Sequence, residues 1–218
     1  MDIQNTNKKI LNQMDIISEI KNAEKERRPV NLSNSVIADL SMITDKVKEG
    51  LILENTEVKG PIFLGEVIIL GELNLRNAIV NGSVYLGNSE INDDLILENA
   101  FVKGAINLVG AKIKGNVNAK KITTMGFFSL SKAEIGGDVI LEEANIKSAQ
   151  YEDLSVRGDL FLGTAKIKGS LNLGKMTSEG LIDMEDVNIG NNLVLTGVKS
   201  GKGEIDTTTM KLEGKKII

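Results

Sequence analysis

The chain has 218 residues, a formal net charge of −4 and a hydrophobic fraction of 41%, which is ordinary for a protein that folds. It contains no cysteine and no histidine, which excludes disulfides and removes both the usual general base near neutral pH and the commonest transition-metal ligand. Only 3% of the residues are aromatic, so a core must be filled by Leu, Ile, Val and Ala. We therefore expect no enzymatic activity, no cofactor and no metal.

The N-terminal segment is predicted to be an amphipathic helix over residues 6–27, ended by Pro29. Its apolar residues near one face are Ile10, Met14, Ile17 and Ile20. We expect residues 1–29 to cap the β structure that follows. The alternative is a helix that binds a partner or a membrane surface, although its polar face carries both signs of charge, which disfavours a membrane.

The same segment lacks the uninterrupted apolar stretch of a secretory signal. Nowhere does the sequence contain the run of about 18 apolar residues that a membrane span requires. We therefore expect a cytoplasmic protein that has no membrane partner.

Residues 30–214 repeat with a period of about 11 residues, and four positions of each repeat are apolar. The spacings between these positions are two, three, two and four residues. Residues two apart share a face in a strand but not in an α-helix, so each close pair predicts a short strand with both side chains pointing inward. Two repeats then make one four-sided coil of about 22 residues, and stacked coils bury each strand between two neighbours. In this register Leu73 and Leu95 stack inside the coil.

The four-residue corner of each repeat carries a glycine or a small polar residue at one fixed position. Its members are Gly60, Gly71, Gly82, Asp93, Gly104, Gly115, Gly126, Gly137, Gly158, Gly169, Gly180 and Asn191. Because these residue types accept positive φ at low cost, we predict a left-handed residue at each such corner. The corner after Ile146 is shorter and holds Ser148, so Ala149 is predicted to be the next inward residue. The following inward residues are then Tyr151, Leu154 and Val156.

Towards the C-terminus, residues 200–203 are predicted to form an inserted loop. The regular spacing then returns at Ile205, Thr207, Met210 and Leu212. The tail, residues 215–218, is expected to close the core or to meet a second subunit, which would give a homodimer through a solenoid end.

Alanine occupies the small inward position in several repeats, at Ala78, Ala100, Ala111, Ala133, Ala144 and Ala165. Stretches such as GAKIKGNVN and GTAKIKGSLNL repeat the pattern. In these features the chain resembles the pentapeptide-repeat family. The resemblance implies a right-handed quadrilateral parallel β-helix with about 22 residues per coil, to which the sequence adds an N-terminal α-helix. Alternate corners carry one extra residue, so the chain resembles a divergent, 11-residue double-repeat variant, and no functional residue is transferred.

Several residues predicted to point outward in the first half are apolar. Phe63 and Tyr85 are one coil apart and should stack on one face, about 4.8 Å apart along the axis. Ile79 and Phe101 should stack in the same way on the adjacent face. These four residues are the candidate interaction surface, because an exposed apolar patch usually marks a contact. The alternatives are that the N-terminal helix covers them, or that a β surface tolerates them.

Outward charges also form columns. Glu54, Arg76, Glu98, Lys120 and Glu142 follow one another at one-coil intervals and predict a structural ladder of salt bridges. Lys59, Lys103, Lys147 and Lys168 are predicted to share another face. No aromatic residues interleave with these lysines, so we expect no nucleic-acid partner. Paired acids such as Asp93–Asp94 are interpreted as solvated turn residues rather than as a metal site.

The pattern favours a non-enzymatic repeat scaffold that presents a flat β surface to an unidentified protein partner. The resemblance supplies an alternative, because some pentapeptide-repeat proteins mimic duplex DNA and inhibit or protect a type II topoisomerase, DNA gyrase. Such a mimic needs long rows of acidic side chains, and here Arg76 and Lys120 interrupt the acidic column. An enzyme is the third hypothesis, and the sequence offers it no nucleophile–base pair.

Overall fold

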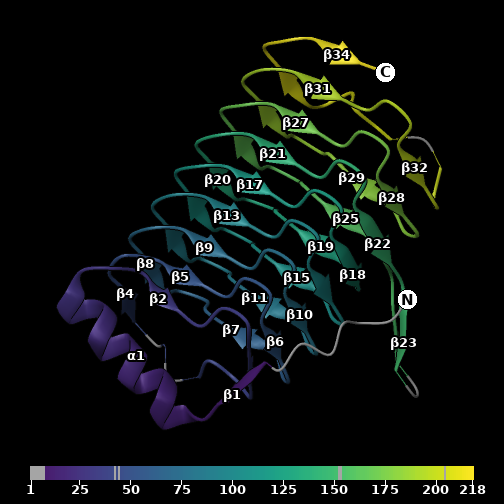
Figure 1. Ribbon diagram of the computed structural model, residues 1–218. Helices are drawn as coiled ribbons and strands as arrows, with labels where there is room; N and C mark the ends of the chain where they lie inside the picture. Colours follow the sequence, from purple (N-terminus) through teal and green to yellow (C-terminus); the bar gives the residue numbers. More distant parts are fainter. Residues whose placement is uncertain (1–7, 42, 44, 152–153, 204) are drawn as a thin grey trace.

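In a computed structural model the chain forms a stack of β coils with a helix at the N-terminal end (Figure 1). The structure describes residues 8–41, 43, 45–151, 154–203 and 205–218. The coil has four sides, and each side contributes one parallel sheet that runs along the axis. We call these sheets faces I to IV, in the order in which the chain passes through them.

Among the residues that the structure describes, faces I and II are the longest, with nine strands each. Face I consists of β2 (Val30–Asn31), β5 (Leu51–Ile52), β9 (Leu73–Asn74), β13 (Leu95–Ile96), β17 (Val117–Asn118), β21 (Val139–Ile140), β27 (Leu171–Asn172), β31 (Leu193–Val194) and β34 (Lys216–Ile217). Face II consists of β1 (Lys9–Leu11), β3 (Ser35–Ile37), β6 (Glu57–Val58), β10 (Ile79–Val80), β14 (Phe101–Val102), β18 (Thr123–Met125), β22 (Asn145–Lys147), β28 (Thr177–Ser178) and β32 (Lys199–Ser200).

Faces III and IV complete the coil. Face III consists of β7 (Ile62–Phe63), β11 (Val84–Tyr85), β15 (Ile106–Asn107), β19 (Phe128–Ser129), β25 (Leu160–Phe161) and β29 (Ile182–Asp183). Face IV consists of β4 (Lys46–Val47), β8 (Ile68–Ile69), β12 (Glu90–Ile91), β16 (Lys112–Ile113), β20 (Glu134–Ile135), β26 (Lys166–Ile167), β30 (Asn188–Ile189) and β33 (Lys211–Leu212).

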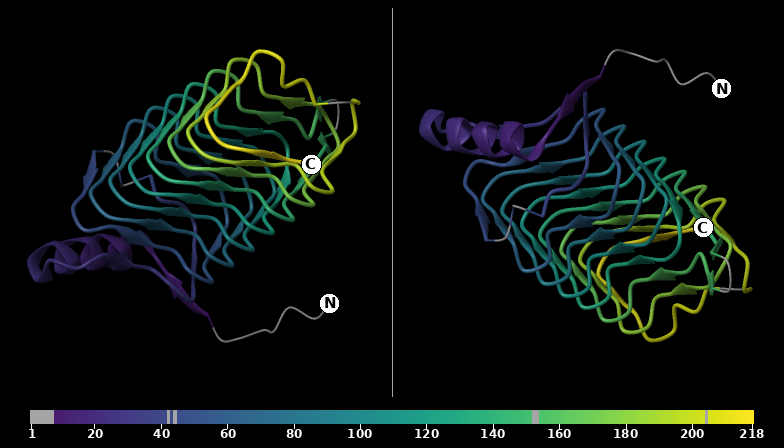
Figure 2. Two further views of the ribbon diagram at one scale, coloured as in Figure 1. Left: turned by 90° about the horizontal axis from the view of Figure 1, so that it is seen from above. Right: turned by 90° about the horizontal axis from the view of Figure 1, so that it is seen from below.

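The core is the narrow interior of the coil. Leu73 pairs in register with Leu95 of the next coil, and both side chains are fully buried. Each such leucine contributes about 1.5–3 kcal/mol through removal of its apolar surface from water. The predicted four-sided parallel β-helix is thereby confirmed, and Figure 2 shows its coils following one another in regular succession.

A few inward positions are polar, and their hydroxyls bond to neighbouring carbonyls. Thr56 Oγ1 donates to the Leu32 carbonyl at 2.7 Å, and Thr124 Oγ1 donates to the Gly104 carbonyl at 2.6 Å. A buried hydroxyl without a partner would be costly, and these bonds offset that cost.

The prediction of left-handed residues at the four-residue corners is confirmed at Gly126, whose φ is +151°, and is wrong at the other predicted positions. The residues with positive φ lie mainly at the three-residue corners: Asn34, Asn55, Glu66, Asn77, Asn88, Asn99, Lys121, Lys132, Glu143, Thr164, Lys175 and Asp186. At most of the four-residue corners the glycine is instead explained by a close approach of adjacent coils, although Asp93 and Asn191 hold the equivalent position at two corners. A Cβ on Gly71 would lie 2.3 Å from the Glu49 carbonyl oxygen, and one on Gly82 would lie 2.6 Å from the Pro61 nitrogen.

Polar side chains continue the hydrogen-bond ladder around the corner that leads into face I. The Asn116 backbone N–H donates to Asp94 Oδ1 at 2.6 Å, and that of Asp138 donates to Asn116 Oδ1 at 2.8 Å. The Ser170 N–H in turn donates to Asp138 Oδ1 at 2.6 Å. Asp94 is therefore a structural acceptor between coils rather than only a solvated turn residue.

The irregularity after Ile146 is an inserted hairpin, not a shortened corner. β23 (Ala149–Tyr151) and β24 (Leu154–Val156) pair in antiparallel fashion. Phe128 pairs with Ile106 of the coil before it and with Leu160 of the coil after it. The chain between Phe128 and Leu160 is longer by ten residues than the chain between Ile106 and Phe128, and these ten residues lie outside the coil. The prediction that Ala149 and Val156 begin and end a further pair of inward strands was therefore wrong, because both belong to this hairpin. Tyr151 and Leu154 pair with each other in it, and their side chains lie outside the described residues.

The base of the hairpin is held by polar contacts. The Ser148 N–H donates to Glu179 Oε2 at 2.8 Å, and the Gly158 N–H donates to Ser148 Oγ at 3.1 Å. Lys147 and Gly158 occupy the places that consecutive residues take in other coils. The coil therefore closes as if the hairpin were absent.

At the N-terminal end the helix is shorter than predicted. α1 spans Gln13–Glu26, and Asn12 caps it through a reciprocal capping box with Asp15. Residues 9–11 form β1, which pairs with β3. The predicted apolar face was wrong at Ile10 and Met14, which are 78% and 72% exposed, and correct at Ile20, which packs against the core. The residues buried against the core are instead Ile16 and Ala23, with Ile20 partly buried.

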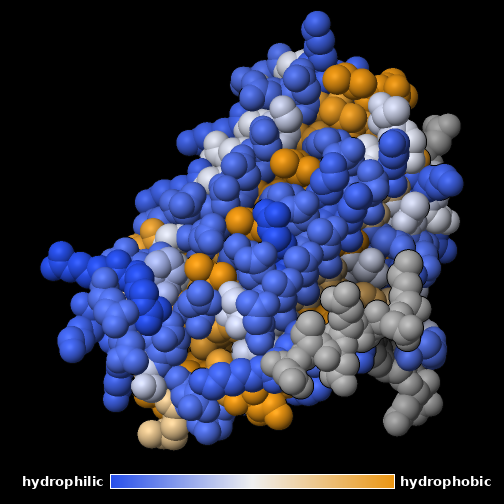
Figure 3. Space-filling model, viewed as in Figure 1, coloured by the Kyte–Doolittle hydropathy of each residue, from blue (hydrophilic) through white to orange (hydrophobic). Residues whose placement is uncertain are grey.

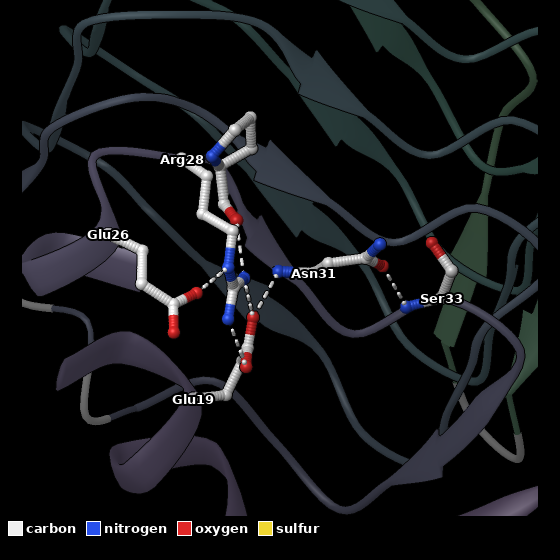
Figure 4. A network of polar contacts seen from close by, with 6 residues as sticks. Glu19, Glu26, Arg28, Asn31 and Ser33 are labelled. Atoms are coloured by element: carbon white, nitrogen blue, oxygen red, sulfur yellow. Dashed lines mark hydrogen bonds and ion pairs between the residues drawn. The ribbon is translucent and has the colours of Figure 1, made fainter. Parts of the chain in front are cut away.

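A polar network joins α1 to the first coil (Figure 4). The Glu19 carboxylate accepts hydrogen bonds from the Arg28 guanidinium and, at 3.0 Å, from the backbone N–H of Asn31 in β2. The Arg28 hydrogen bond is the main cause that holds the pKa of Glu19 below its ordinary value. Because β2 is the edge of face I, Glu19 satisfies a backbone donor that an uncovered edge would leave open.

At the other end, Lys216–Ile217 forms β34, so the predicted C-terminal tail continues face I instead of closing the core. The register places Lys216 beside Leu193, in an inward column. Ile217 and Ile218 are 45% and 86% exposed.

Candidate interaction surface

Phe63 in β7 and Tyr85 in β11 form a stacked pair on face III. The two residues pair in register, and their rings are parallel to within 3° with centroids 5.0 Å apart. Phe63 is 57% exposed and Tyr85 is 37% exposed. The pairing follows from their one-coil spacing, as predicted, and the stack places two apolar rings in contact with solvent.

A hollow of about 400 Å³ lies beside this pair. Its lining residues are Ser41, Ile43, Phe63, Gly65, Val67 and Tyr85. Gly65 contributes no side chain, and Ile43 and Val67 are buried, so the hollow has an apolar floor. The arrangement leaves room for a ring or a branched aliphatic side chain next to Phe63, where it would extend the aromatic contact.

Ile79 and Phe101 form the second predicted pair, on face II. They are partners in register between β10 and β14, and both side chains are half-buried. The corner that contains Gly82 separates them from Phe63 and Tyr85. The structure thus brings the four predicted residues together as two pairs on adjacent faces, not as one continuous patch.

The N-terminal helix does not line the hollow beside Phe63. It contacts β1 and β2 at the end of the stack. The alternative in which the helix covers the Phe63–Tyr85 pair is therefore wrong for the part of α1 that the structure describes.

Ile43, Gly65 and Val67 belong to the hollow but were not predicted as site residues. Ile43 precedes the regular repeat, so its place could not be read from the period. Val67 is an inward residue and is buried, so the repeat pattern assigned it to the core and not to a surface hollow. Gly65 and Gly87 both follow the aromatic column by two residues, a spacing that could have indicated the hollow.

The predicted charge ladder is present as separate ion pairs. Arg76 lies 3.1 Å from Glu98, and Lys120 lies 2.8 Å from Glu142. The hydrogen bond from Lys120 lowers the pKa of Glu142, and the same bond raises the pKa of Lys120. These partly exposed contacts neutralise charge along one edge of the stack and add little stability each.

Figure 3 shows one side of the molecule as mostly hydrophilic, with separate apolar spots along the axis and a larger apolar area near the C-terminal end. In the outward column of face I, asparagine and a branched residue alternate from Asn31 to Val194. That column runs Asn31, Ile52, Asn74, Ile96, Asn118, Ile140, Asn172 and Val194. From Asn31 to Asn172 each apolar side chain of this column is flanked by amides, whereas Val194 is followed by Ile217 of β34, which is 45% exposed, so face I carries one apolar pair at its C-terminal end.

Within the described ranges, no three side chains of metal-ligand type converge, and no helix combines the length and apolar character needed to cross a membrane. No family model, curated protein or solved structure matches the chain.

Proposed function

We propose that this β-solenoid is a non-enzymatic scaffold that binds a protein partner through the Phe63–Tyr85 pair and the hollow beside it. The single observation that carries the proposal is the exposed parallel stack of two rings next to an apolar hollow of about 400 Å³. Aromatic residues placed beside a pocket are the usual anchors of protein interfaces. The partner's complementary feature is an aromatic or branched aliphatic side chain that enters the hollow.

We further propose that the chain is a divergent relative of the pentapeptide-repeat family. The support is the four-sided coil, which two sequence repeats complete, and the small inward residues such as Ala78 and Ala100. The proposal concerns fold and ancestry, and it assigns no activity.

The binding proposal is tested with Phe63→Lys, which places a charge at the mouth of the hollow. Proteins that co-purify with the wild-type chain from native lysate, and that crosslink to it in purified form, should be lost from this variant. Leu70→Lys is the matched control, because Leu70 is an exposed apolar residue on face IV with 38% exposure, close to that of Tyr85. If both variants retain the same crosslinked partners, the surface does not bind them.

The DNA-mimic hypothesis has less support. The ion pairs of Arg76 with Glu98 and of Lys120 with Glu142 interrupt the acidic row that a mimic of the phosphate backbone requires. We therefore expect excess protein to leave the supercoiling activity of DNA gyrase unchanged, and inhibition would revive that hypothesis.

A further inference from the structure

Face IV carries a second hollow, of about 610 Å³, in the middle of the stack. It spans β16, β20 and β26. Its lining residues are Lys112, Ile113, Lys114, Glu134, Ile135, Gly136, Lys166 and Lys168. We call this hollow the lysine trough. It lies on a different face from the Phe63–Tyr85 pair, so a ligand bound there is independent of the proposed function.

One side of the lysine trough is electrically balanced. Glu134 lies between Lys112 and Lys166 in the outward column of face IV. Its carboxylate accepts a hydrogen bond from Lys166 at 2.8 Å, and Lys112 lies 3.9 Å from Glu90. The Lys166 hydrogen bond is the main cause of the lowered pKa of Glu134, with smaller contributions from the charges of Lys166, Lys112 and Lys168.

On the other side of the lysine trough, the positive charges are not balanced by acidic side chains. Here the outward column runs from Lys114 through Gly136 to Lys168, with no acid between the two lysines. In the described part of the chain, neither lysine side chain has a hydrogen-bond or ion-pair partner, and both residues are exposed. Because they lie on strands two apart, their backbones are separated by about 9.6 Å. Two cations thus flank one open position.

Gly136 keeps that position open. A Cβ at this residue would lie 2.1 Å from the Lys114 carbonyl oxygen and 2.9 Å from its carbonyl carbon. No side chain fits there without a shift of the backbone, so the space between Lys114 and Lys168 is a fixed property of the coil.

The inserted hairpin decides this arrangement. The repeat alone predicted that Lys168 shares a face with Lys59, Lys103 and Lys147, and this was wrong. Those three residues follow or end β6, β14 and β22 of face II, whereas Lys168 follows β26 of face IV. The ten extra residues move Lys168 into the column of Lys114.

We propose that the lysine trough is a binding site for a phosphate-type dianion, held over Gly136 between the ammonium groups of Lys114 and Lys168. A phosphate group carries close to two negative charges at neutral pH and so balances both lysines, which a single carboxylate does not. Lysine binds phosphate as a point charge on a flexible stem, and two stems can converge on one group across the trough. Glu134 repels an anion from its own end, which places the ligand at the Gly136 end.

The same chemistry is offered by free inorganic phosphate and by a phosphoanhydride. The test therefore titrates inorganic phosphate and inorganic pyrophosphate separately into the full chain by isothermal calorimetry. It is done at low ionic strength, because salt screens exposed charges. We expect saturable binding with one ligand per chain. Tighter binding of pyrophosphate identifies the phosphoanhydride as the better ligand, and equal or tighter binding of phosphate identifies the free ion.

The lysines are tested by the double variant Lys114→Gln/Lys168→Gln, for which we expect a loss of affinity of about tenfold or more. The control is Lys21→Gln/Lys25→Gln, which removes the same charge from exposed positions of α1 and should leave the affinity within about twofold. Glu134→Gln should strengthen binding several-fold. All three variants alter exposed side chains, and far-UV circular dichroism checks that they fold.

Two results overturn the proposal. One is the absence of saturable binding of either anion by the wild-type chain. The other is an equal loss of affinity in the two lysine double variants, which shows that the anions respond to net charge alone.

Discussion

The interior at Leu95 and the corner after Ile146 differ in how much change of sequence the fold tolerates there. Leu95 is fully buried between Leu73 and Val117, so its size is fixed by both neighbours. The corner instead accommodates ten additional residues, and the strands on either side keep their register. This solenoid therefore constrains what points inward and how closely coils approach, and it leaves the outside of a corner free.

The interior is the region most sensitive to substitution. Leu95→Ala should lower the free energy of unfolding by about 2–5 kcal/mol, because it leaves a cavity in a stack that cannot collapse locally. Urea denaturation measures the change. Ile96→Ala, at the neighbouring outward position, is the control and should cost less, and equal losses for the two variants would contradict the assigned register.

The close approach at the corners is tested by Gly71→Ala. The added Cβ meets the Glu49 carbonyl oxygen at 2.3 Å and its carbon at 2.7 Å, so the backbone must shift. We expect a loss of about 1–3 kcal/mol in a thermal or urea melt.

Gly87→Ala is the matched control, because its Cβ would meet its nearest neighbour at 3.5 Å, an ordinary contact. It should change stability by no more than about 0.5 kcal/mol. Alanine lowers the entropy of the unfolded chain and so does not itself destabilise, and a similar loss in both variants would contradict the close approach of coils as the cause of the Gly71 result.

The contact between helix α1 and the first coil is tested by Glu19→Gln. This variant should lower the free energy of unfolding by about 1 kcal/mol at pH 7, because it loses a charged hydrogen-bond acceptor. Because the pKa of Glu19 is lowered in the folded chain, its contribution is complete above its ordinary value of 4.5 and is lost as the pH falls through the folded value. The stability difference between wild type and variant should therefore shrink below pH 4.5, as measured by urea denaturation across pH.

Glu24→Gln is the control for this pH dependence. Glu24 is on the same helix as Glu19, lies 3.4 Å from Lys48, and has a side chain that is 42% exposed. The variant should change stability little at any pH, and a loss equal to that of Glu19→Gln would mean that the helix responds only to net charge.

Deletion of residues 148–157 should change stability least. A Cβ built on Gly158 lies 2.5 Å from the Lys147 carbonyl carbon, so the two residues already sit side by side and can be joined. We expect a folded chain with a stability within about 1 kcal/mol of the wild type, since shortening a loop changes little free energy.

The control deletion is residues 106–115, also ten in number, which removes the inward side chains of Ile106, Leu108 and Ile113. Circular dichroism should show that only this variant loses its β structure. Loss of structure in both deletions would mean that the hairpin takes part in the fold.

Much of the coil could be predicted from sequence, because the period fixes which side chains point inward. Leu73 over Leu95 and Phe63 beside Tyr85 both follow directly from it. The glycine column was predicted for the wrong reason, because Gly71 is required by the close approach of a neighbouring backbone and not by a positive φ of its own. Ala149 was misassigned because the hairpin has nearly the length of one repeat and carries apolar residues at similar spacing. Lys168 was misplaced as a consequence, and Ile43 was missed because it precedes the regular pattern.

The stacking of coils also fixes the axial distance between the two proposed sites. Tyr85 in β11 and Glu134 in β20 belong to coils two turns apart, so their axial separation is set by two steps of about 4.8 Å each. Because each coil contacts only its neighbours, excising or duplicating one full turn would change that spacing by a single step while leaving both sites intact. The distance between the two proposed sites can thus be changed only in whole turns.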